Sequence, residues 1–194
     1  KIAMDKKHEL LKRFFPLLDN KELIKNWKAN YIDRKIIKKF YSSKGADVIF
    51  DTQLAGLSIG MEFVEEGKRL SESYQKAYDT FDKLCEDLEE FKSYVKECEN
   101  FLTNAKPIKP GKYTVILSPL AAGVFAHESF GHKSEADFMI GDETMKKEWA
   151  IGKRVGSEIL SIIDDGNIIG SGYVPFDDEG SKSKKIYLIK NGIL

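Results

Sequence analysis

The stretch TFDKLCEDLEEFKSYVKECENFLTN, residues 80–104, decides much of the fold, because its hydrophobic periodicity is the clearest in the chain. Apolar side chains recur in alternating steps of three and four, which places them on one face of a helix. Thr80 or Asp79 is expected to cap this helix. The spacing also fits a coiled coil, but the segment is short for one, so we expect packing on a sheet. The apolar positions are Phe81, Leu84, Leu88, Phe91, Val95, Cys98 and Leu102.

The residues before this helix are typical of an antiparallel meander. β-branched and aromatic side chains alternate with charged ones, and turn signals stand at SSKG (42–45) and EEG (65–67). The last segment of the meander is expected to be a strand or an irregular stretch. The predicted strands are residues 30–41, 47–52, 57–64 and 69–78.

Two further helices are predicted at the start of the chain. Residues 5–15 place apolar side chains on one side, with Asp5 as a candidate cap and Pro16 as the breaker. Residues 20–29 are expected to form a short helix that Asn20 caps. The fold class is therefore α+β, an antiparallel sheet with long packing helices.

The linker AKPIKPG, residues 105–111, marks a domain boundary. We predict an N-terminal α/β domain over residues 1–110. Residues 111–194 then hold the motif helix and the start of a β-rich C-terminal domain. In this second part we expect a buried strand at 112–117, a helix that Ser118 caps with Pro119 at its first position, and strands at 158–163, 168–174 and 184–190.

Composition excludes several classes of protein. The 194 residues carry 31 basic and 31 acidic side chains, and this zero net charge argues against direct nucleic-acid binding by bulk electrostatics. We find neither a membrane-spanning stretch nor a signal peptide. Cys85 and Cys98 read as free thiols, which favours a cytoplasmic protein. Because the chain begins at Lys1, we expect a piece of a longer protein.

The motif HESFGH, residues 127–132, carries the chemistry. Neutral imidazole is a common zinc ligand, but side chains five residues apart on a regular helix diverge by ~140°. His127 and His132 can share one ion only if the helix widens or ends between them. A π-type turn restores a common face, and Gly131 can supply that distortion or a helix end.

Acidic residues surround the two histidines. Glu128 adjoins a ligand but points to a different face, which suits a general base acting on water rather than a ligand. Glu135 and Asp137 can orient a histidine through a hydrogen bond, although a solvated loop is an equal alternative. The acidic run DDE at 177–179 is expected to serve a turn or an inter-domain contact.

The stretch GVFAHESFGHKSEAD, residues 123–137, resembles the signature of the TldD/PmbA family, also called peptidase family U62 or modulator of DNA gyrase proteins. The similarity continues through GSEILSIIDDG (156–166) and VPFDDEG (174–180), and it ends in KNGIL (190–194). It covers most of residues 112–194. Several spaced motifs in the right order make this match specific, and the intact histidine motif groups the chain with the metal-bearing, TldD-like members.

The resemblance implies a zinc-dependent peptidase that acts on unfolded peptides. His127 and His132 are then zinc ligands and Glu128 the catalytic base, while the third ligand is expected beyond Leu194. Parts of the family's chain are expected to be missing at both ends, so this fragment is predicted to be inactive and to bind zinc weakly. Family members work as homodimers or as heterodimers with a related subunit.

Two further expectations concern the substrate and a rival function. An extended peptide is expected to add a strand to a sheet edge in the second half. The alternative function is a non-catalytic scaffold or subunit of a proteolytic complex, in which the motif helix only packs.

Overall fold

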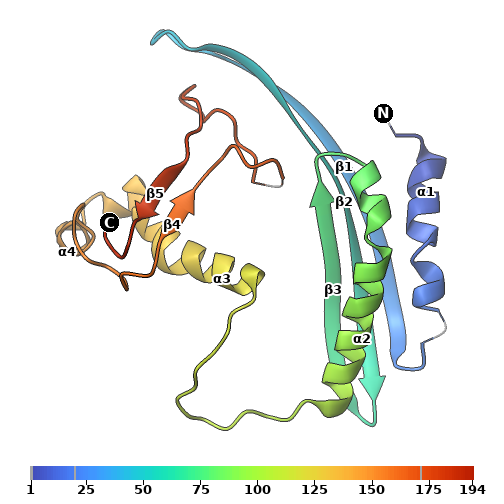
Figure 1. The fold of residues 1–194 in the computed structure, drawn as a ribbon. Coiled ribbons are helices and arrows are strands. Elements are labelled where there is room, and N and C mark those ends of the chain that lie inside the picture. The colour runs from blue at the N-terminus through green and yellow to red at the C-terminus, as the bar shows by residue number, and fades with distance from the viewer. Residues whose placement is uncertain (1, 20, 171) are drawn as a thin grey trace. The chain divides into compact units, whose positions relative to one another are not determined.

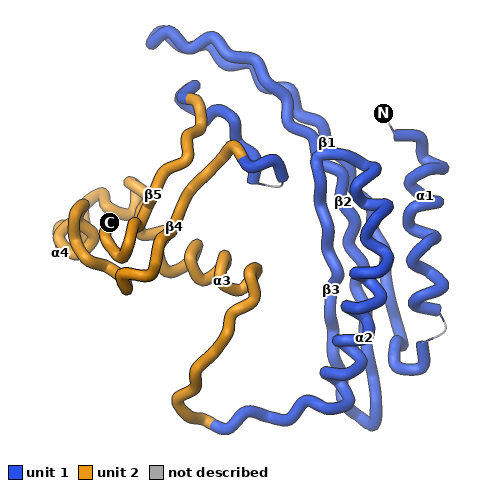
Figure 2. Tube along the Cα trace, in the orientation of Figure 1, with its two compact units in different colours: residues 1–109, 168–181 blue, residues 110–167, 182–194 orange. Residues whose placement is uncertain are grey.

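The computed structural model describes residues 2–19, 21–170 and 172–194. The chain divides into two compact units, which Figure 2 distinguishes by colour. The first unit comprises residues 1–109 and 168–181, and the second comprises residues 110–167 and 182–194. The chain changes unit between residues 109 and 110, within the segment that the sequence marks as a linker, and it returns to the first unit for residues 168–181.

A three-stranded antiparallel sheet forms the first unit (Figure 1). β1 (Ile24–Tyr41) pairs with β2 (Asp47–Glu65), which pairs with β3 (Lys68–Tyr78). The two predicted segments at 47–52 and 57–64 are thus one long strand. β3 pairs only with Ala55–Glu65, so the distal halves of β1 and β2 continue as a two-stranded ribbon.

One face of this sheet carries the hydrophobic core, because alternate side chains of a strand point to the same side. α1 (Met4–Lys12), η1 (Phe15–Leu17) and α2 (Leu88–Asn104) supply the residues that cover this face. Phe14 and Phe91 meet edge to face with ring centroids 5.2 Å apart. The β2 side chains buried in the core are Ala55, Leu57, Ile59, Met61 and Phe63.

Two predicted helices of the first unit differ from the structure. The long helix begins at Leu88, after the 3-10 helix η2 (Asp82–Glu86), so neither Thr80 nor Asp79 caps it. The helix expected at 20–29 is wrong from Ile24 onward, since these residues extend β1; Asn20 itself lies outside the described residues. Pairing of Trp27 with Met61 across the sheet overrides the local helical spacing.

The first helix also begins differently from the prediction. Ala3 stands at its N-cap position with no side-chain cap, and Asp5 lies in its first turn. An acidic side chain there still favours the helix, because it faces the positive end of the helix dipole.

The second unit is built from short elements around the motif helix. Ser118 caps α3 as predicted, because its hydroxyl accepts a hydrogen bond from the Ala121 N–H at 3.3 Å. Residues 112–117, the predicted buried strand, are neither strand nor buried. The other elements are η3 (His127–Gly131), η4 (His132–Ser134), η5 (Ala136–Met139), α4 (Glu143–Glu148), β4 (Ile162–Asp164) and β5 (Ile186–Ile189).

The sheet of the second unit is smaller than predicted. β4 and β5 form an antiparallel pair, whereas residues 168–174, a predicted strand, are irregular where described and lie in the first unit. The turn predicted after the last strand is present, with positive φ at Asn191 and Gly192. Among the described residues, no helix is long and apolar enough to cross a membrane.

Candidate metal centre

The motif helix changes its pitch where the two histidines require it. α3 (Pro119–Ala126) is followed directly by η3, a π-helical turn over His127–Gly131, in which the His132 N–H donates to the His127 carbonyl five residues earlier. This wider turn is the distortion that the odd spacing predicted, and that prediction is confirmed. Because a π-turn adds a residue to the turn, positions five apart come to lie on one face.

Gly131 contributes less to this turn than expected. Its φ of −59° and ψ of −56° are ordinary right-handed helical values, so the turn does not need the conformational freedom of glycine. A Cβ built there would lie 3.8 Å from the Ala126 carbonyl oxygen and 3.9 Å from His127 Nδ1, which are ordinary contacts. Gly131 therefore neither ends nor strains the helix.

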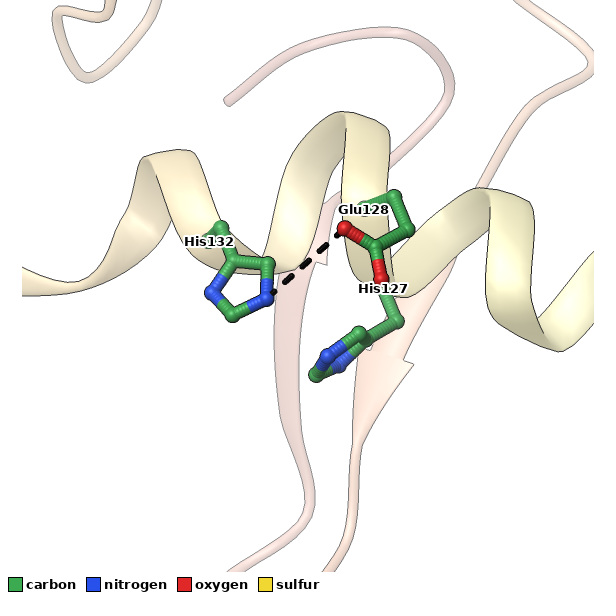
Figure 3. Close-up of side chains that lie close together, drawn as sticks. All are labelled: His127, Glu128 and His132. Atoms are coloured by element: carbon green, nitrogen blue, oxygen red, sulfur yellow. Dashed lines mark ion pairs between the residues drawn. The ribbon is translucent and has the colours of Figure 1, made fainter.

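The two imidazoles and one carboxylate gather at this turn (Figure 3). The His127 and His132 ring centroids are 4.4 Å apart. One ligand atom from each of His127, Glu128 and His132 lies within 4.8 Å of the other two. Ligand atoms that each bind one zinc at ~2 Å are about 3.3 Å apart in a tetrahedral site. Small side-chain rotations would therefore suffice, and this donor set fits zinc.

Glu128 lies closer to the histidines than the sequence suggested. The prediction placed its side chain on a different face, but its Oε2 is 3.9 Å from His132 Nε2. The cause is the four-residue spacing between Glu128 and His132, which brings their side chains together. Glu128 can thus reach either a metal ion or a molecule bound beside one.

Glu135 sets the orientation of the His132 ring. Its Oε1 lies 2.6 Å from His132 Nδ1. A carboxylate only accepts hydrogen bonds, so Nδ1 is the donor, and in the neutral imidazole the lone pair is then on Nε2, the nitrogen nearer Glu128. Asp137, the other predicted neighbour, lies in η5 and is not part of the three-residue cluster.

Sequence reasoning missed the residues that hold the turn. The Ser134 hydroxyl donates to the Phe130 carbonyl at 3.0 Å, and Trp149 Nε1 donates to Ser134 Oγ at 3.3 Å. The four-residue step from Phe130 to Ser134 was a usable signal, because serine hydroxyls often bind the carbonyl four residues earlier. No local pattern points to Trp149, since it is distant in sequence.

The remaining candidate residues lie outside the cluster. Asp177 Oδ1 accepts the N–H groups of Glu179 and Ser181 at 2.9 and 2.8 Å, which is the turn role expected of the acidic run. Both cysteines are free thiols of the first unit. Burial is the main cause that raises the pKa of Cys98 to about 11, so this thiol is protonated at neutral pH.

Comparison with known proteins gives the same family as the motif. Residues 110–194 match the model of the PmbA/TldA metallopeptidase C-terminal domain. The chain belongs to the PmbA/TldD family. A zinc metalloprotease TldD homologue of Saccharolobus solfataricus is 34% identical over 181 residues, covering 88% of this chain and 39% of that protein. A metalloprotease of Methanocaldococcus jannaschii is 49% identical over 94 residues, covering 48% and 21%.

Two solved structures share the fold of this chain. A proposed modulator of DNA gyrase from Thermotoga maritima matches with a TM-score of 0.84 at 22% identity, covering 100% of this chain and 44% of that one. TldE from Thermococcus kodakarensis matches at 0.66 and 19% identity, covering 100% and 43%. The chain thus spans less than half the length of each of these four relatives.

Proposed function

We propose that this chain carries the metal-binding part of a zinc-dependent peptidase, with His127 and His132 as zinc ligands. The observation that supports the proposal most is the π-turn, which gathers both imidazoles and the Glu128 carboxylate within 4.8 Å. Metalloprotease relatives point to the same chemistry. A third protein ligand is expected in a part of the whole protein that follows residue 194.

In this proposal, Glu128 is the general base and Glu135 positions a ligand. When bound, zinc supplies a Lewis acid that polarises a peptide carbonyl and makes water more acidic. The Glu128 carboxylate accepts the proton of the attacking water and passes it to the leaving amine. Glu135 orients the His132 ring through its hydrogen bond to Nδ1, which leaves Nε2 for the metal.

The substrate is proposed to be an unfolded peptide in extended form. β4 and β5 make a two-stranded sheet in the second unit, and an extended peptide can add a strand to such an edge. Backbone hydrogen bonds would then bind the peptide largely regardless of its sequence. We include in the proposal that the whole protein works as a dimer of two like or related subunits, and the cytoplasmic location stays a prediction.

The decisive experiment measures zinc content and peptide cleavage together, in the whole protein. His127→Ala and His132→Ala should abolish zinc binding and cleavage of an unstructured fluorogenic peptide. Glu128→Gln should keep the zinc and lose the cleavage. His8→Ala is the matched control, because His8 is an exposed histidine of α1 in the other unit.

The opposite outcome would favour the scaffold function. If the wild-type protein cleaves no peptide and the two histidine variants hold as much zinc as the wild type, the motif helix only packs. The inactivity predicted for the 194-residue chain alone is tested by the same cleavage assay.

A further inference from the structure

The π-turn is stabilised from one side by side chains that lie outside the histidine motif. A π-turn is rare and less favourable than a regular α-turn, so it persists where surrounding contacts hold it. The carbonyl of Phe130 lies within this turn, between the two histidines. The contacts of that carbonyl therefore bear directly on the spacing of the two rings.

Ser134 and Trp149 form a hydrogen-bonded relay to that carbonyl. An indole N–H can only donate, so Trp149 Nε1 donates to Ser134 Oγ at 3.3 Å. The hydroxyl proton of Ser134 then points to the Phe130 carbonyl oxygen, 3.0 Å away. Both hydrogen bonds are partly buried, which strengthens them relative to exposed ones.

Trp149 is itself held in place by its neighbours. Its backbone N–H donates to the Met145 carbonyl at 2.8 Å at the end of α4. Its ring lies 6.1 Å from the Phe130 ring, centroid to centroid, and the Lys133 ammonium lies 5.6 Å from its centroid. The indole thus contacts the turn through ring packing as well as through Ser134.

We propose that Ser134 and Trp149 are positioning residues, which hold the π-turn so that His127 and His132 converge before any metal binds. If the turn relaxed to regular α-helix, residues five apart would diverge by ~140° and the rings would separate. We call the hydrogen bonds from Trp149 to Ser134 and from Ser134 to the Phe130 carbonyl the clamp. The effect of the clamp on zinc affinity rests on the proposed zinc site, but the clamp itself is a property of the metal-free chain.

The test compares variants of the 194-residue chain without metal and with zinc. The His132 amide donates a hydrogen bond to the His127 carbonyl, so its exchange with deuterium reports on the π-turn. Without metal, this exchange should be about fivefold faster in Ser134→Ala and in Trp149→Phe, because each variant loses one hydrogen bond. Ser134→Thr keeps a hydroxyl and should restore slow exchange. In a zinc titration against a chromophoric chelator, Ser134→Ala and Trp149→Phe should bind zinc about fivefold more weakly than the wild type.

Trp27→Phe is the matched control. Trp27 Nε1 also donates a hydrogen bond, to Asp19 Oδ1 at 3.1 Å, but it lies in the first unit. This variant should change neither His132 exchange nor zinc binding.

The two readouts separate the two proposals. If the His132 amide of Ser134→Ala and Trp149→Phe exchanges as slowly as that of the wild type, the clamp is wrong, regardless of the zinc affinity of the chain. If the wild-type chain and the histidine variants show the same zinc affinity, the metal site fails while the exchange rates still decide the clamp. Faster exchange in the Trp27→Phe control would also count against it, because the effect would then be general destabilisation.

Discussion

α2 and α3 are both rich in apolar residues, yet they lie in opposite environments. α2 buries Phe91, Val95, Cys98 and Leu102 against the sheet of the first unit. α3 has no buried residue, and Leu120 is 81% exposed. The comparison teaches that the first unit is stabilised by packing, whereas the conformation of the motif turn depends on local hydrogen bonds. Each prediction below tests one side of this contrast.

The largest effect is expected in the core. Phe91 is fully buried and contacts Phe14 and Tyr74 edge to face, so Phe91→Ala should cost about 3–5 kcal/mol of unfolding free energy. Phe125→Ala in α3 is the matched control, since Phe125 is 55% exposed, and it should change stability by about 0.5 kcal/mol or less. Urea unfolding followed by far-ultraviolet circular dichroism measures both variants, because this signal reports the backbone of both units. Equal losses would show that the contrast between the helices is wrong.

The next effect concerns metal affinity rather than stability. Glu135→Ala removes the hydrogen bond that orients His132, and zinc should bind about 10–100-fold more weakly. Glu135→Gln should lose less, because an amide oxygen still accepts from Nδ1. Asp137→Ala is the control and should leave affinity unchanged. A chelator competition titration checks all three, and an effect in Asp137→Ala equal to that in Glu135→Ala would reject the assignment.

A smaller effect depends on pH and belongs to the first unit. Burial raises the pKa of Asp87, whose Oδ1 accepts a hydrogen bond from the Tyr78 hydroxyl at 3.0 Å while its Oδ2 is buried without a partner. The folded state therefore favours the protonated acid, and this contribution is lost as the pH rises through the raised pKa. Asp87→Asn should stabilise the protein at neutral pH by roughly 1 kcal/mol, with a gain that shrinks in acid.

Denaturant unfolding at several pH values measures this difference. Tyr78→Phe is a useful companion variant, because it removes the hydrogen bond that favours the charged form and should destabilise the fold more at neutral pH than in acid. A stability gain in Asp87→Asn that grows as the pH falls would contradict the assigned direction.

The smallest effect is expected at Gly131. Its backbone angles are helical and a Cβ would meet only ordinary contacts, so Gly131→Ala should keep the π-turn. Zinc affinity and His132 amide exchange should stay within about twofold of the wild type, because no contact of the turn is lost. A large loss in either would show that the turn needs glycine after all.

Local patterns predicted well wherever short-range physics dominates. The Ser118 cap, the turn at 42–45 and the π-turn all follow from side chains within a few residues of one another. Predictions failed where partners are distant in sequence. Residues 24–29 are a strand because β2 pairs with them, and residues 112–117 stay exposed because no described strand pairs with them.

The amino-acid sequence by itself determined the family, the α+β class and the need for a helix that widens or ends between His127 and His132, because these follow from residue types and their spacing along the chain. Only the tertiary structure decided how that turn is held. Ser134 is joined to Trp149 across 15 positions, and such contacts form only after the chain has folded back on itself.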